Sequence, residues 1–328
     1  MVALGVALAA CAGRPPAPAR AAAPAVTVER TSFHGWEALV LRNGAAEVTV
    51  VPAIGRIMQL ALAGAGAPRG PLWNHPGLGP QLPPDENGWI NFGGDKAWPA
   101  PQSAWEAVAG KGWPPPRTFD AAAFTAEVAA DGALTLVSPV DPAYGLEVRR
   151  TIALAPGAPV VTVETCYHKV AGAPVRVGVW TITQLASPER IFLRLPDRSA
   201  FPGGFVQRLP DRPRALAVEG RLLSLARDPA KKTMIASDGE ALLWVGDGPD
   251  LLIETLPEKH EPGASWPDGA HAQIYTSSDE ALPYVELELL SPLEDLNLGE
   301  RVCLRVRYTL RARTEADARA EAKGVLGP

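Results

Sequence analysis

Two glutamates near the end of the chain are well placed for acid–base chemistry. In the segment 284–292 they alternate with aliphatic residues, so a strand would carry Glu286 and Glu288 on one face. Burial and a neighbouring like charge both raise the pKa of a carboxyl group, which suits it to proton transfer. The alternative is a strand that turns its polar face to water.

A second cluster of polar and aromatic residues occupies the segment 91–105, with the sequence Asn-Phe-Gly-Gly-Asp-Lys-Ala-Trp-Pro-Ala-Pro-Gln-Ser-Ala-Trp. It follows neither a helical nor a strand period, and we interpret it as an ordered loop. Gly93 and Gly94 permit positive φ or a close backbone approach. Aromatic faces beside fixed hydrogen-bonding groups suit a sugar, whose C–H faces stack and whose hydroxyls need directional partners. The alternative is that the tryptophans cap a hydrophobic core.

The rest of the chain predicts strands. Short β-prone runs are separated by turn residues such as Asn43-Gly44 and Asp131-Gly132. We expect strands at 26–30, 38–42, 47–51, 146–154, 159–170, 176–185, 191–195, 221–225, 232–236, 241–245, 251–255, 271–276, 284–290 and 301–310. Only the segment from Thr314 to Lys323 has a helical pattern, with Thr314 as the expected N-cap. The predicted fold class is all-β, a large antiparallel sandwich with a short C-terminal helix.

Composition excludes some functions. The 328 residues include 31 basic and 36 acidic side chains, for a net charge of −5, and basic residues do not cluster. Nucleic acid is therefore an unexpected partner. We find no phosphate-binding loop or nucleophile elbow, and we predict no cofactor and no metal site.

The N-terminus resembles a lipoprotein signal. Residues 1–11 form a short apolar run ending in Leu-Ala-Ala-Cys, which matches a bacterial lipobox, although a basic residue is missing at its start. Cys11 would carry the lipid, and the Ala/Pro-rich residues 12–25 would form a tether. The alternative is an Ala-rich N-terminus with a chance cysteine. The other two cysteines, Cys166 and Cys303, lie in strand-like runs and are equally consistent with a disulfide or with two buried thiols.

Three motifs in order suggest a family. The first is a Pro-x-x-Gly-Arg-Ile corner at 52–57, the second Leu-Trp-Asn-His-Pro at 72–76, and the third the stretch from Asn91 to Pro99. Together they resemble the galactose mutarotase-like superfamily, which includes aldose 1-epimerases, and in particular a bacterial family within it. The resemblance extends from Val26 to about Leu310 and implies a β-supersandwich.

The resemblance also implies catalytic roles. In mutarotase-like enzymes a late glutamate removes the proton of the anomeric hydroxyl, and strand position points to Glu286 or Glu288, with Glu286 preferred. Aldose 1-epimerases carry an Asn-His pair near mid-chain, but the corresponding strand here, 179–184, has no histidine. His75 is the best substitute for the acid.

We therefore predict a lipid-anchored protein of the bacterial cell envelope, with a sandwich domain over 26–313 and a helical tail over 314–328. It would bind a mono- or oligosaccharide in a concave groove, with epimerase-like proton transfer as an option. The alternatives are a non-catalytic glycan-binding or scaffold lipoprotein, and an accessory module of a polysaccharide lyase or hydrolase. The expected substrate-binding residues are Arg56, Asn91, Asp95, Lys96, Trp98, Gln102, Trp105 and Trp180.

Overall fold

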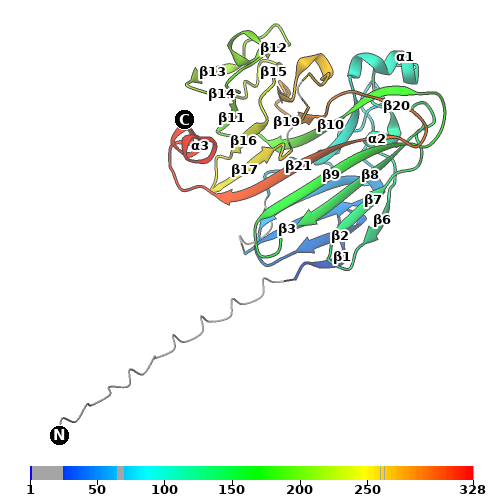
Figure 1. Ribbon diagram of the computed structural model, residues 1–328, viewed down its shortest axis with the longest axis horizontal. Coiled ribbons are helices and arrows are strands. Elements are labelled where there is room, and N and C mark those ends of the chain that lie inside the picture. Colours follow the sequence, from blue (N-terminus) through cyan, green and yellow to red (C-terminus); the bar gives the residue numbers. More distant parts are fainter. Residues whose placement is uncertain (2–24, 65–69, 259, 262, 328) are drawn as a thin grey trace.

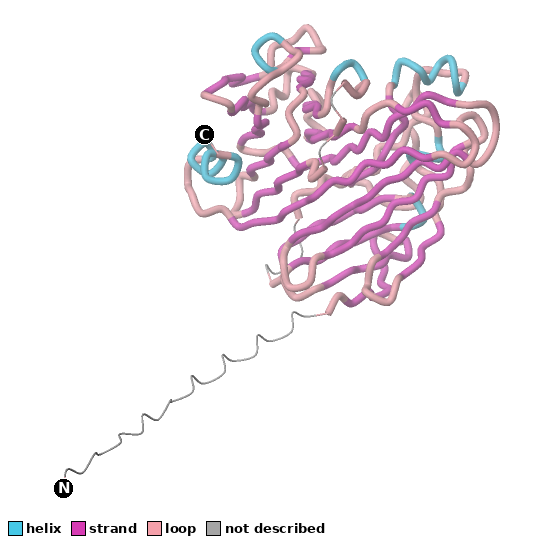
Figure 2. The backbone as a smooth tube through the Cα atoms, viewed as in Figure 1, coloured by secondary structure: helices cyan, strands magenta, loops and turns pink. Residues whose placement is uncertain are grey.

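The computed structural model describes residues 1, 25–64, 70–258, 260–261 and 263–327. Strands dominate these residues, and the helices are short (Figure 2). Cys11 and residues 12–24 of the expected tether lie outside the described residues. In the described part of the chain, no helix combines the length and the apolar character needed to span a bilayer.

The elements follow one another as an almost unbroken series of strands (Figure 1). Those in the first half of the chain are β1 (Thr27–Phe33), β2 (Trp36–Arg42), β3 (Ala46–Val51), β4 (Arg56–Leu62), β5 (Asp95–Ala100), α1 (Trp105–Ala109), α2 (Arg117–Asp120), β6 (Thr125–Val128), β7 (Leu134–Val137), β8 (Leu146–Leu154) and β9 (Val160–Lys169). Those in the second half are β10 (Val175–Ala186), β11 (Arg190–Arg194), β12 (Val206–Gln207), β13 (Arg214–Glu219), β14 (Leu222–Ala226), β15 (Thr233–Ser237), β16 (Ala241–Val245), β17 (Asp250–Thr255), β18 (Ala272–Thr276), β19 (Tyr284–Leu290), β20 (Glu294–Leu296), β21 (Arg301–Ala312) and α3 (Ala318–Leu326).

Two antiparallel sheets make up the sandwich. The first sheet has the order β1-β2-β3-β4-β5-β10-β19-β18-β15-β12, and β20 also pairs with β10. The second has the order β13-β14-β11-β16-β17-β21-β9-β8-β7-β6. The prediction of a large antiparallel β-sandwich with a short C-terminal helix is confirmed. Because β5, β10 and β19 are neighbours at the middle of the first sheet, segments far apart in the sequence meet there.

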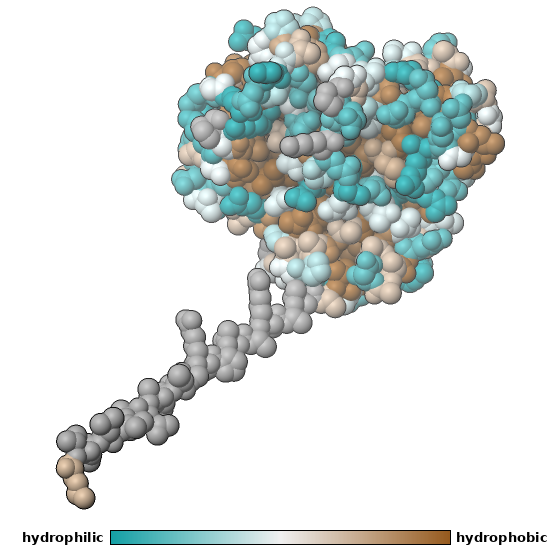
Figure 3. Space-filling view, viewed as in Figure 1, coloured by the Kyte–Doolittle hydropathy of each residue, from teal (hydrophilic) through white to brown (hydrophobic). Residues whose placement is uncertain are grey.

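The hydrophobic core lies between the two sheets. In β21 five buried residues alternate with partly exposed ones: Val302, Leu304, Val306, Tyr308 and Leu310. The same alternation in β8 leaves the outer face of the second sheet solvated. On the face drawn in Figure 3, polar and apolar side chains are accordingly interspersed.

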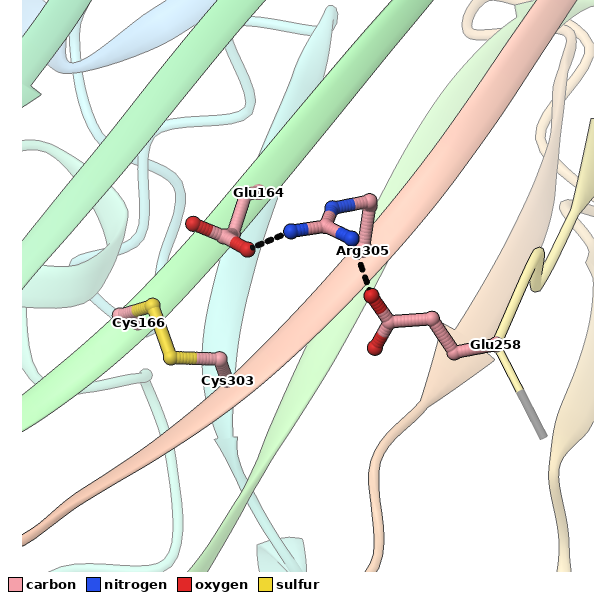
Figure 4. The surroundings of a disulfide bond; sticks show 5 residues. All are labelled: Glu164, Cys166, Glu258, Cys303 and Arg305. Atoms are coloured by element: carbon pink, nitrogen blue, oxygen red, sulfur yellow. Dashed lines mark hydrogen bonds and ion pairs between the residues drawn. A yellow bond between two sulfur atoms is a disulfide. The ribbon is translucent and has the colours of Figure 1, made fainter. Parts of the chain in front are cut away.

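A disulfide bond joins two central strands of the second sheet. Cys166 of β9 lies directly opposite Cys303 of β21, and the two sulfur atoms are bonded (Figure 4). Close by, Arg305 bridges Glu164 of β9 and Glu258. The disulfide resolves the choice left open by the sequence in favour of pairing.

The C-terminal helix packs against the second sheet. Its apolar residues Ala318 and Ala322 are buried with Phe192 of β11 and Leu243 of β16. The helix begins later than expected because Asp317, and not Thr314, is its N-cap: the Asp317 carboxylate accepts a hydrogen bond from the amide of Ala320.

A polar cluster is buried between the sheets. Asp95 of β5 forms an ion pair with Arg150 of β8 and accepts hydrogen bonds from the hydroxyls of Thr183 (3.0 Å) and Tyr308 (2.8 Å). Oγ1 of Thr183 also lies within hydrogen-bond distance of Oε2 of Glu254 in β17, at 3.2 Å. Burial raises the pKa of Glu254 well above its ordinary value, and the nearby Asp95 charge raises it further, which favours the protonated form. We call these five residues the inter-sheet cluster.

Candidate functional site

A hollow of about 450 Å³ lies on the face of the first sheet that is turned away from the second sheet. We call it the central hollow. Strands β19, β18, β15 and β10 form its floor, and aromatic side chains surround it. The residues that line it are Trp89, Trp98, Gln102, Trp113, Trp180, Leu209, Lys232, Met234, Tyr275, Tyr284, Glu286 and Glu288.

The period of two in β19 places both glutamates in this hollow. Val285, Leu287 and Leu289 belong to the core between the sheets, so Glu286 and Glu288 project from the opposite face. Directly paired residues of neighbouring strands share a face. The pairing of Glu286 with Gln184 of β10 and Tyr275 of β18 therefore adds polar neighbours on the same side.

The two carboxyl groups have different surroundings. Glu288 is 1% exposed, and its Oε2 accepts a hydrogen bond from the indole Nε1 of Trp180 at 2.8 Å. Burial raises the pKa of Glu288 well above its ordinary value, and the charge of Glu286 adds to the rise. Burial also raises the pKa of Glu286, but the Lys96 ammonium opposes that rise. Glu288 is therefore the better proton donor and Glu286 the better base.

Lys96 lies beneath the hollow, beside Glu286. Its Nζ is 3.6 Å from Glu286 Oε1 and 4.9 Å from the ring centroid of Trp98. The side chain is 1% exposed, and within the described residues its Nζ has no hydrogen-bond partner. Burial lowers the pKa of Lys96 to about 8, so the ammonium remains mostly charged at neutral pH.

Asp120, at the end of α2, fixes two of the tryptophans. Its Oδ1 accepts a hydrogen bond from Nε1 of Trp98 (2.9 Å), and its Oδ2 accepts one from Nε1 of Trp89 (3.1 Å). The guanidinium of Arg56 binds the same carboxylate at 2.6 Å. Trp98 also makes edge contacts with Trp180, at 5.4 Å between ring centroids. These contacts hold the rings of Trp89, Trp98 and Trp180 in place, and we call these three rings the aromatic wall.

The interpretation of the segment 91–105 as a loop is wrong at its centre, because Asp95–Ala100 forms strand β5. β5 pairs with β10 along its length but with β4 only at Asp95, so Pro99 needs no ladder partner on the open side. The expectation for the glycines is confirmed, since Gly93 and Gly94 have positive φ. A Cβ on Gly93 would meet the Trp73 carbonyl oxygen at 2.3 Å.

Strand geometry separates the residues expected to bind substrate. Lys96 and Trp98 project from the same face of β5: Trp98 lines the central hollow directly opposite Trp180, and Lys96 is buried beneath the hollow. Asp95 points the other way, into the inter-sheet cluster, where it is fully buried. A substrate in the hollow does not reach Asp95, because successive residues of a strand point to opposite faces.

Two other expected binding residues are also fully buried behind the hollow. Arg56 is 0% exposed and binds Asp120 and the carbonyl of Gly93 at 2.7 Å. Trp105 is 0% exposed and donates to the carbonyl of Pro99 at 2.7 Å. Both therefore support the wall of the hollow and do not line it.

His75 and Asn91 lie in an adjoining hollow of about 350 Å³, which we call the His75 hollow. Its lining shares Trp89 and Tyr284 with the central hollow. On another side, a hollow of about 180 Å³ shares Gln102, Trp180 and Met234 with the central one. The structure thus brings Glu286, Glu288, Trp98, Trp180 and Gln102 together in the central hollow. His75 lies in the adjoining His75 hollow.

Sequence reasoning missed several residues of the site. Tyr275 lines the hollow from β18, Met234 from β15 and Lys232 from the position just before β15, and these segments carry no motif. The sequence around Asp120 does not indicate its role either, because that role depends on a tertiary contact with Trp98. The period of two in β15 and β18 was the only available signal, and it does not reveal which face carries a site.

Size alone does not select the site. Two larger hollows, of about 660 and 570 Å³, are lined mainly by charged and polar residues, with no tryptophan or tyrosine among those described. Within the described residues, no group of three or more histidine, cysteine, aspartate or glutamate side chains is arranged to hold a metal ion. The central hollow is distinguished by two carboxyl groups with perturbed pKa values among aromatic rings.

The comparisons with solved structures support the fold. A galactose mutarotase-like protein from Lactobacillus casei has a TM-score of 0.54 and 10% identity, over 84% of this chain and 100% of that one. A putative aldose 1-epimerase from Klebsiella pneumoniae has a TM-score of 0.53 and 11% identity, over 86% of this chain and 83% of that one. A TPR-domain containing protein from Parabacteroides distasonis has a TM-score of 0.55 and 13% identity, over 84% of this chain and 47% of that one. This chain therefore spans about half the length of that protein.

Comparisons of the sequence give no further identification. No family model matches the chain, and no curated protein matches it. The structural likeness, at this low identity, establishes the fold.

Proposed function

We propose that this protein, which has the galactose mutarotase-like fold, binds carbohydrate in the central hollow and transfers protons at the anomeric carbon. The observation that carries the proposal is the pair Glu286 and Glu288, held under an aromatic wall with their pKa values raised to different degrees. Aromatic faces stack on sugar C–H groups, and the carboxyl groups supply directional hydrogen bonds.

The roles of the two glutamates as base and acid follow from their different surroundings. Glu286, beside the Lys96 ammonium, takes the proton of the anomeric hydroxyl. The electron pair of that O–H bond forms the C1=O1 carbonyl while the C1–O5 bond breaks, and protonated Glu288 gives its proton to O5. Rotation about C1–C2 and the reverse transfers close the ring as the other anomer. Glu288 takes the role of acid because it lines the same hollow as Glu286, whereas His75 lines the adjoining one.

A non-catalytic glycan-binding protein is the second candidate. The strand segment 179–184 lacks the histidine that the resemblance leads one to expect. In this version the aromatic wall and the carboxyl groups bind sugar hydroxyls without turnover, since a fold alone does not determine activity. A module of a polysaccharide-degrading enzyme differs from it only in preferring long glycans.

Location in the bacterial cell envelope is part of the proposal. The disulfide between Cys166 and Cys303 supports it, because such bonds persist in oxidising compartments. The lipobox-like sequence ending at Cys11 adds a lipid anchor to the proposal.

Binding is tested by calorimetric titration of the purified protein with a panel of monosaccharides, oligosaccharides and polysaccharides. We expect saturable binding of at least one sugar. The exposed ring of Trp113 lines the central hollow, so Trp113→Ala should weaken that binding up to about tenfold, as expected for one aromatic contact. Trp36→Ala, at a ring that does not line the hollow, serves as the matched control. The absence of binding across the panel would refute the proposal.

A further inference from the structure

The His75 hollow adjoins the central hollow, and the two share lining residues. Its volume is about 350 Å³, against about 450 Å³ for the central hollow, and Trp89 and Tyr284 line both. Trp89 is held through its Nε1 by Asp120, and Tyr284 packs on Trp73 with ring centroids 4.8 Å apart. A ligand that fills the central hollow can therefore extend over a fixed aromatic edge.

The chemistry of the His75 hollow is that of a sugar site. Nδ1 of His75 accepts a hydrogen bond from the amide of Gly77 at 2.9 Å, so the neutral ring carries its proton on Nε2. Burial lowers the pKa of His75, which keeps the ring neutral at pH 7. Oδ1 of Asn91 is buried and has no hydrogen-bond partner among the described residues. The hollow thus combines a donor, an unused acceptor and apolar walls that include Leu82 and Leu282.

The charges of the hollow restrict what it accepts. Its ionisable lining residues besides His75 and Tyr284 are Asp85 and Asp279, and no lysine or arginine is present among the described residues that line it. Two lining carboxylates repel an anionic group such as a uronate or a phosphate. The guanidinium of Arg227 binds the main-chain carbonyls of Ser277 and Asp279 and does not line the hollow. They accept hydrogen bonds from hydroxyl groups, so the ligand unit that fits is uncharged.

We infer that the His75 hollow is a second sugar subsite, and that the ligand is a neutral glycan of at least two units with one ring in each hollow. This inference rests on the proposed function, because it assumes a sugar in the central hollow. The reducing-end ring would lie against Glu286 and Glu288, and the next ring would lie between Asn91 and Asp279. The shared rings of Trp89 and Tyr284 would contact the link between the two units.

The experiment compares binding of monosaccharides with binding of disaccharides that contain them. Calorimetric titrations would use glucose and galactose, then maltose, cellobiose and lactose. We expect at least one disaccharide to bind about tenfold or more tightly than its monosaccharide, which corresponds to about 1.4 kcal/mol. Leu282→Trp should fill the His75 hollow and bring the ratio of the two affinities close to one. Leu298→Trp, at an exposed leucine that lines neither hollow, is the matched control for the added indole.

The outcomes separate the two proposals. Equal affinity of the unmodified protein for monosaccharides and disaccharides would overturn the second subsite and leave the central site intact. An affinity ratio that survives Leu282→Trp, in a variant whose thermal melting shows an intact fold, would overturn it as well. If no saccharide binds, both proposals fail.

Discussion

Two polar clusters share the strand β5 and differ in how their charges are matched. Asp95 points between the sheets, where Arg150, Thr183 and Tyr308 bind its carboxylate. Lys96, the next residue, points to the opposite face, where Nζ has no hydrogen-bond partner among the described residues and Glu286 is 3.6 Å away. In the first cluster the protein itself binds the Asp95 carboxylate on all sides, which serves stability. Within the part of the chain that the structure describes, the second leaves a hydrogen-bond donor without a partner beside an open hollow, and this arrangement suits a ligand.

The largest effect is expected from breaking the inter-sheet cluster. Arg150→Met would leave the Asp95 carboxylate buried without a cation, and removing one partner of a buried ion pair costs about 3–5 kcal/mol. Chemical denaturation should show that loss of unfolding free energy. Arg176→Met, which removes an exposed pair with Asp295, is the control and should change stability little. Equal effects of the two substitutions would contradict the assignment of the first cluster to stability.

A smaller effect is expected from removing the Lys96 cation beneath the central hollow. The Lys96 ammonium lowers the pKa of Glu286, so Lys96→Met should raise that pKa. Because Glu286 must be ionised to act as a base, the acidic limb of the pH–rate profile should move to higher pH, by about 1–3 units for an opposite charge at this range. Lys232→Met removes a more distant, exposed charge and should move the limb less. An unchanged limb in Lys96→Met would refute the role of Lys96.

Alternation in the sequence predicted much of the fold. The period of two in β19 correctly placed Glu286 and Glu288 on one face, and β-prone runs correctly predicted strands such as β21. The pairing of Cys166 with Cys303 was left open, because the register of β9 against β21 joins residues far apart in the chain. Local patterns carry no information on such pairings.

The errors at the site have a common cause. The glycines and prolines around Asp95 suggested a loop, which hid the alternation that sends Asp95 and Lys96 to opposite faces. Arg56 was expected to bind substrate, whereas here Asp120 neutralises it inside the protein. Asp120 itself belongs to no motif, and only the packing of α2 against β5 reveals it.

The most direct test of the central claim is the rate at which the protein interconverts sugar anomers. Exchange between the α and β anomers of the sugars that bind would be followed by NMR or polarimetry at neutral pH. We expect the protein to accelerate this exchange, and Glu286→Gln to reduce the acceleration by about 10²–10⁴-fold while binding and melting temperature persist. Acceleration that survives in Glu286→Gln, or none in the unmodified protein despite saturable binding, would contradict proton transfer at this site.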